Sequence, residues 1–170
     1  MFPSLKHFKP AEFRIWAARM HPVFLLALDN IRDVSEIPIM ISPAAGALGR
    51  TEGSKTSQHY IKGPKTILKV SDVMPYKVTE SGSKQAVTLE EMMLLIDIAK
   101  ELGMTGIGIY PRWKPYPGLH LDMREPKTEG HIATWAGLPV KTSDGIKQKY
   151  FSMKTGITHF YDWDENSWPT

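Results

Sequence analysis

Three of the residues whose side chains commonly bind metals could form one metal site. His59 opens the stretch "HYIKGPKTILKVSD", Asp72 ends it, and His120 lies in the apolar run "GLHLDM". Catalytic zinc usually has three protein ligands and keeps a fourth position for water. Because the 170 residues include no Cys, a metal could be bound here only by His and carboxylate groups. The residue types permit such a site. A purely structural, hydrogen-bonded role for the histidines is the alternative.

The residues around His120 alternate as they do in a β-strand. Successive side chains of a strand point to opposite faces, so Leu119 and Leu121 would face the core. His120 and its even-numbered neighbours would share the other face. This periodicity predicts a strand over residues 118–123 with His120 on its polar face.

Asp122 shares that face with His120, and we predict it as the catalytic residue. A side chain two residues further along a strand lies about 7 Å away. From there Asp122 could act as a general base or orient the His120 imidazole. A structural salt bridge to Arg124 or Lys127 is the alternative.

Other residues close to His120 in the sequence could contact a substrate. Tyr110 and Arg112 flank the turn before it and could stabilise an oxyanion or bind a carboxylate. Trp113, Tyr116 and Trp135 could line a groove for a glycan or a peptide, although aromatic side chains also serve simply as core residues. We count Tyr110 and Arg112 among the predicted substrate-binding residues.

Helices and short strands must position these residues. Proline at the first turn predicts helices over residues 9–20 and 21–36, since its missing N–H leaves no helical hydrogen bond unmade there. A third helix begins with a capping box of Thr88 and Glu91 and ends at Gly103. Apolar or alternating runs predict strands at 37–42, 66–70, 105–110 and 118–123. This order of elements predicts an α+β fold with a small, mainly antiparallel sheet flanked by helices.

Bulk composition limits the class of protein. Hydrophobic residues make up 42% and charged residues 23%, which is ordinary for a globular domain. No run approaches the roughly 18 apolar residues that span a bilayer, so we expect no membrane span. The net charge of +3 is small and the basic residues are dispersed, so we expect no nucleic-acid partner. The first residues lack the basic start and apolar core of a secretory signal.

Several separate motifs occur in an order that is typical of one family. They are "LKHFKPAEF", "MHPVFLLALDNIRDVSEIPIMIS", "TSQHYIKG", "GMTGIGIYP", "GLHLDMR" and "HIATWAG". In these motifs and their order, residues 5–138 resemble the M15 family of zinc peptidases. The resemblance is to its phage and bacterial subset, which is related to D-alanyl-D-alanine carboxypeptidases and murein endopeptidases.

This resemblance implies a metal site, a fold and an activity. His59, Asp72 and His120 correspond to the zinc ligands of the family, with Zn²⁺ as the cofactor. Ser57 matches the first position of an S-x-H-x-x-G motif, and Arg50 approximates an arginine that holds the substrate carboxylate, so we count both among the predicted substrate-binding residues. The implied fold is the antiparallel sheet with flanking helices that the family shares with hedgehog-type domains. The implied activity is cleavage of peptide bonds in the peptidoglycan stem or cross-link.

The same resemblance implies a biological setting. Peptidoglycan would be the partner, and a phage or prophage would encode the chain. Lacking a secretory signal, the protein would stay in the cytoplasm of an infected host until release to the cell wall. Otherwise it would be part of the virion, in contact with other virion proteins.

Three departures from the family pattern favour an alternative function. Residues 60–71 separate His59 from Asp72 by more than the usual spacing, and we expect them to form a hairpin or loop that returns Asp72 to His59. The arginine segment reads "SPAAGALGR", and Pro117 stands where some branches have a general-base carboxylate. The alternative is an M15-like scaffold with impaired catalysis that acts as a virion, tail or wall-binding protein.

The chain also divides into two expected parts. Residues 1–139 would form the peptidase-like domain. Residues 140–170 are polar and aromatic. We expect them to be a C-terminal extension, packed on or attached to the same domain as an extra strand pair or an attachment segment.

Overall fold

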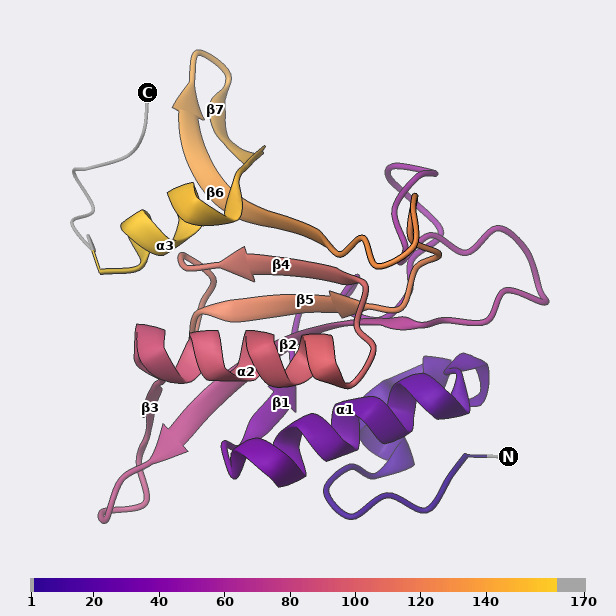
Figure 1. Cartoon of the computed structure of the whole chain (residues 1–170). Helices are drawn as coiled ribbons and strands as arrows, with labels where there is room; N and C mark the ends of the chain where they lie inside the picture. Colours follow the sequence, from indigo (N-terminus) through magenta and orange to yellow (C-terminus); the bar gives the residue numbers. More distant parts are fainter. Residues whose placement is uncertain (1, 162–170) are drawn as a thin grey trace.

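A seven-stranded sheet positions the candidate ligands (Figure 1). The computed structural model describes residues 2–161. Within them the fold is α+β, with a mostly antiparallel open sheet and four helices, which confirms the predicted fold class. Each helix in this range is too short or too polar to cross a membrane. The elements are η1 (Pro10–Arg19, a 3₁₀-helix), α1 (Pro22–Ser35), β1 (Ile39–Ile41), β2 (Val70–Val78), β3 (Lys84–Ala86), α2 (Leu89–Glu101), β4 (Gly106–Tyr110), β5 (Gly118–Asp122), β6 (Ala133–Thr142), β7 (Gly145–Phe151) and α3 (Met153–Tyr161).

The strand order places the candidate site in the middle of the sheet. The order is β1-β2-β5-β4-β6-β7, with β3 paired to the far part of β2. Among these pairs β4 and β6 run parallel, and the others are antiparallel. Asp72 on β2 lies opposite His120 on β5, which in turn lies opposite Gly108 on β4. The two predicted ligands are therefore neighbours across a strand pair.

The helices bury their apolar faces against one side of this sheet. The predicted capping box of α2 is present, because the Glu91 N–H donates to the Thr88 hydroxyl and the Thr88 N–H donates to the Glu91 carboxylate. Leu119 and Leu121 of β5 join the same core, so His120 lies on the other face, as predicted. The largest fully buried helical side chains of α1 and α2 are Phe24, Leu25, Leu28, Ile31, Met92, Leu95 and Ile96.

The strand predicted at 66–70 is wrong, because sheet pairing begins only at Val70. The backbone of Leu68 pairs instead with the end of η1, where its N–H donates to the Arg19 carbonyl at 2.8 Å. This contact lies outside the sheet. Since β2 runs from Val70 to Val78, Asp72 lies inside a strand.

A 3₁₀-helix, η1, replaces the regular helix predicted over residues 9–20. It is interrupted at Arg14, whose φ is 52°. Such a conformation costs a residue other than glycine about 1–3 kcal/mol. The Arg14 guanidinium offsets this cost, since it donates to the carbonyls of Ser42 and Ala44 at 2.7 and 2.9 Å.

The C-terminal segment continues the same sheet. β6 and β7 form an antiparallel hairpin at the sheet edge (Figure 1), and α3 packs on β6 and β4. The boundary that we expected between residues 139 and 140 falls inside β6. Part of the expected C-terminal extension therefore belongs to the central sheet. Residues 162–170, the last part of the expected extension, lie outside the described residues.

Candidate metal centre

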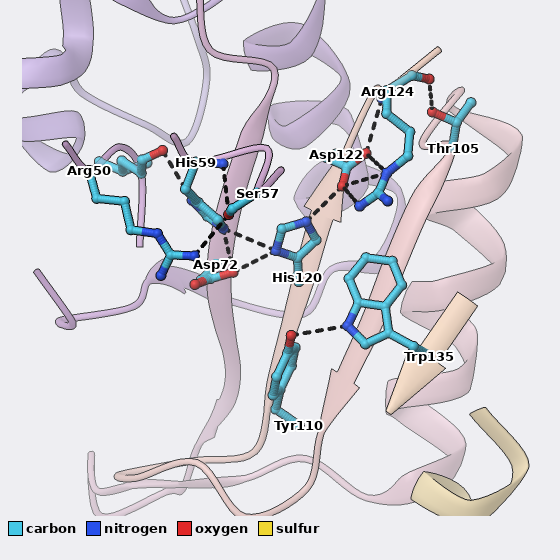
Figure 2. A network of polar contacts seen from close by, with 11 residues as sticks. Arg50, Ser57, His59, Asp72, Thr105, Tyr110, His120, Asp122, Arg124 and Trp135 are labelled. Atoms are coloured by element: carbon cyan, nitrogen blue, oxygen red, sulfur yellow. Dashed lines mark hydrogen bonds and ion pairs between the residues drawn. The ribbon is translucent and has the colours of Figure 1, made fainter. Parts of the chain in front are cut away.

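Three segments that are distant in the sequence bring the candidate ligands together (Figure 2). Asp72 and His120 are register partners on adjacent strands, so their side chains share one face of the sheet. His59 lies on the loop between β1 and β2. Its carbonyl accepts a hydrogen bond of 2.9 Å from the Arg50 N–H, which joins two parts of this loop. Residues 60–69 form a loop that leads into β2 and returns Asp72 to His59, as predicted.

The distances between the donor atoms are suitable for a metal ion. His59 Nε2 lies 3.1 Å from Asp72 Oδ1 and 3.0 Å from His120 Nδ1, and His120 Nδ1 lies 2.9 Å from Asp72 Oδ1. Two ligands bound at about 2.0–2.1 Å to a tetrahedral ion lie about 3.3 Å apart, so small movements would complete such a site. Both histidines are buried, and the Asp72 side chain is 17% exposed. These three residues could hold a metal ion.

Hydrogen bonds on the far side of each imidazole decide which nitrogen carries the proton. His59 Nδ1 lies 3.1 Å from the Leu48 carbonyl oxygen, and His120 Nε2 lies 2.7 Å from Asp122 Oδ2. A carbonyl and a carboxylate only accept hydrogen bonds, so these two nitrogens are the donors. In the neutral imidazoles the other two nitrogens then offer lone pairs, which converge with a carboxylate oxygen of Asp72. Three such acceptors about 3 Å apart repel one another unless a metal ion or a proton lies between them, and this geometry is the strongest indication of a metal site.

Asp122 lies beneath His120 and is fully buried. Its carboxylate accepts hydrogen bonds from His120 Nε2 and from the backbone N–H and Nε of Arg124. Burial favours the neutral carboxyl, but the contacts with Arg124 and His120 outweigh it and lower the pKa of Asp122 to about 2. Both the ligand-orienting contact and the salt bridge to Arg124 are therefore present. A role in proton transfer stays a prediction.

A pocket of about 570 Å³ opens above the three ligands. Of the predicted substrate-binding residues, Arg50, Ser57 and Tyr110 line it, whereas Arg112, on the turn after β4, does not. Arg50 Nη2 donates to Ser57 Oγ at 2.9 Å, which orients the guanidinium group toward the pocket (Figure 2). Among the described residues of the lining, Asp72 carries the only carboxylate.

Several lining residues were not predicted as site residues. Gln148 and Tyr150 come from β7, in the segment that we expected to be an extension. The alternation in "IKQKYF" over 146–151 could have predicted a strand with both on one face. Arg124, which we considered only as a salt-bridge partner, also lines the pocket.

The pKa of His120 gives a test of the site in the metal-free protein. Burial favours the neutral imidazole, but the carboxylates of Asp122 and Asp72 outweigh it and raise the pKa above its ordinary value of 6.5. A raised pKa contributes stability that is fully present below pH 6.5 and is lost as the pH rises through the folded-state value. We expect an NMR titration of the metal-free protein to place the His120 pKa above 6.5. A value below this would contradict the described contacts with the two carboxylates.

Comparisons of the chain with protein-family models, with curated proteins and with solved structures find no match. The M15 resemblance and the hedgehog-type fold therefore stay predictions. What stands independently of the resemblance is the α+β fold and the convergence of His59, Asp72 and His120 at the base of a pocket.

Proposed function

We propose that this protein is a zinc-dependent peptidase that cleaves peptide bonds in the peptidoglycan stem or cross-link. The observation that carries the proposal is the convergence of two imidazole lone pairs and one carboxylate oxygen at the base of a pocket. Zinc accepts nitrogen and oxygen ligands of this kind, and its catalytic sites have three of them. In this proposal, the substrate class and the hedgehog-type fold are inferred from the M15-like motifs in the sequence.

Zinc bound at this site would polarise a carbonyl group and lower the pKa of a bound water to about 7. The residues around it have separate tasks. Arg50 would bind a substrate carboxylate, since Ser57 already orients its guanidinium group. Burial raises the pKa of Tyr110, so its hydroxyl keeps its proton and can donate to a developing oxyanion. Asp122 would hold the His120 ring and keep its Nδ1 available as a ligand.

The setting proposed for this activity is phage-related. The protein would be encoded by a phage or prophage and act on the host wall after release from the cytoplasm, or as part of a virion. The motifs shared with phage and bacterial M15 members support this part of the proposal, and the basis for it is the sequence alone.

One observation favours the second candidate, a wall-binding or virion protein with impaired catalysis. Within the described lining of the pocket, Asp72 is the only carboxylate, and its Oδ1 is one of the three metal-binding atoms. Asp122 is enclosed and does not reach the pocket surface. A general base near the metal would then have to be supplied by a group other than a pocket carboxylate.

An assay on purified peptidoglycan separates the two candidates. Protein saturated with zinc should release peptide fragments, which mass spectrometry would identify together with the bond that is cut. Removal of zinc with a chelator should stop the release, and added zinc should restore it. If zinc-loaded protein sediments with the wall but releases no fragment from any wall type, the binding function is the right one.

A further inference from the structure

Four aromatic side chains line one part of the metal pocket, and we call Tyr110, Trp113, Trp135 and Tyr150 the aromatic wall. Two contacts fix three of them. The Trp113 ring stacks on Tyr110 with centroids 4.0 Å apart and planes 18° apart. Trp135 Nε1 donates to the Tyr110 hydroxyl at 3.0 Å (Figure 2). Because these rings are already held in place, a ligand that stacks on them would lose little side-chain entropy from the protein.

The strands beneath the wall leave space for the rings because the positions under them are glycine, as two examples show. A Cβ atom at Gly118 of β5 would lie 2.3 Å from the Trp113 ring. A Cβ atom at Gly137 of β6 would lie 2.1 Å from the Tyr110 ring. Both distances are too short for any side chain, so the two rings pack directly on the backbone. The wall is therefore built into the sheet.

The edge hairpin adds polar and exposed groups to the aromatic wall. Gln148 of β7 lines the pocket, and its side-chain amide can both donate and accept hydrogen bonds. Tyr150, on the same face of β7, is 66% exposed, so a large apolar surface faces the solvent. Hydroxyl and amide groups of Thr56 and Gln58 line the same pocket. The pocket thus combines aromatic rings with neutral hydrogen-bonding groups.

A sugar ring has the matching chemistry. One face of a pyranose presents C–H groups that pack on an aromatic ring, whose π face is negative. Its edge carries hydroxyl groups that pair with amides and hydroxyls such as those of Gln148 and Thr56. An aliphatic peptide side chain would match the rings but would leave these polar groups without partners.

We propose that the aromatic wall binds a pyranose ring of the glycan strand while the attached peptide lies at the metal centre. This inference rests on the proposed function for the choice of a wall glycan as the ligand. It goes further, because it makes the sugar part of the substrate a determinant of specificity. Peptide attached to glycan should then bind better than the same peptide alone.

Direct sugar binding tests the inference without any cleavage. The probe is a tetrasaccharide of N-acetylglucosamine, titrated at millimolar concentration into zinc-saturated protein and followed by NMR chemical shifts. We expect wild-type protein to bind it, and Trp113→Ala and Tyr150→Ala each to weaken binding about tenfold. Two matched controls should bind normally. Ile146→Ala changes an exposed apolar residue of the same hairpin. Tyr116→Ala changes an aromatic residue that stacks on Tyr76 and, unlike Trp113 and Trp135, does not line the pocket.

Two results would overturn the inference. One is the absence of shifts in folded wild-type protein, and the other is an equal loss of binding in the control variants. The two proposals fail separately. Sugar binding without release of peptide from peptidoglycan would retain the aromatic wall as a glycan site and refute the peptidase. Peptide release without sugar binding would support the peptidase and refute the aromatic wall as a glycan site.

Discussion

Replacement of His120 with alanine should abolish metal binding, which is the largest effect that the structure predicts. His120 supplies one of three donor atoms, at 2.9 Å from Asp72 Oδ1 and 3.0 Å from His59 Nε2. Loss of a residue that only supports a ligand lowers metal affinity about 10–100-fold, so loss of the ligand itself should exceed about 100-fold. Wild-type protein should retain about one zinc per chain after desalting. The variant should retain none, and zinc should no longer raise its melting temperature.

A second histidine provides the control for this experiment. His131 is exposed and is not one of the three converging residues, so His131→Ala should keep both the zinc and the thermal shift. Circular dichroism would establish that each variant is folded. Equal zinc content in wild type and folded His120→Ala would refute the assignment of the ligands.

Asp122→Asn should retain zinc at saturating concentration but lose most of the release of peptide from peptidoglycan. The asparagine amide has one acceptor oxygen in place of two and carries no charge. It therefore cannot keep all the hydrogen bonds from His120 and Arg124, and the His120 ring would be held less firmly and be less basic. If Asp122 only orients the ligand, zinc affinity and activity should both fall about 10–100-fold. If it takes part in proton transfer, activity should fall about 10²–10⁴-fold at unchanged zinc affinity.

The matched control is Asp97→Asn, which changes an exposed carboxylate of α2 that pairs with Lys100. It should alter neither zinc binding nor peptide release, since surface ion pairs contribute little. Zinc titration and the initial rate of fragment release, measured on the same samples, separate the two roles. Full activity and full zinc affinity in Asp122→Asn would make the residue purely structural.

The features that sequence predicted correctly depend on residues close to one another in the chain. The period of two around His120 placed Leu119 and Leu121 in the core and the histidine on the opposite face. The capping box of Thr88 and Glu91 marked the start of α2. Because such signals involve neighbours only, they can be read without the rest of the fold.

The features that were predicted wrongly depend on contacts between distant segments. Leu68 lies in a run of residues that favours a strand, but its backbone pairs with Arg19 in η1. Arg14 leaves the helical conformation where its guanidinium binds the carbonyls of Ser42 and Ala44. Neither contact can be recognised from the neighbouring residues in the sequence. Tertiary hydrogen bonds therefore override the local prediction.

The candidate site was also predicted correctly in some residues and not in others. The choice of His59, Asp72 and His120 rested on residue types and on motif order, and the structure brings these three together. The contribution of β7 to the pocket depends on the hairpin that β6 and β7 form at the sheet edge. Arg112 was predicted from its place beside the turn, yet it does not line the pocket. Of the two residues predicted from their proximity to His120, Tyr110 therefore lines the pocket and Arg112 does not.

The most direct test of the metal centre is anomalous X-ray diffraction from crystals of the protein grown with zinc. Data collected just above and just below the zinc absorption edge locate the ion independently of the protein phases. We predict one strong anomalous peak, present only above the edge, between His59 Nε2, His120 Nδ1 and Asp72 Oδ1. No peak at this position, with the three side chains in direct contact with one another, would contradict the account.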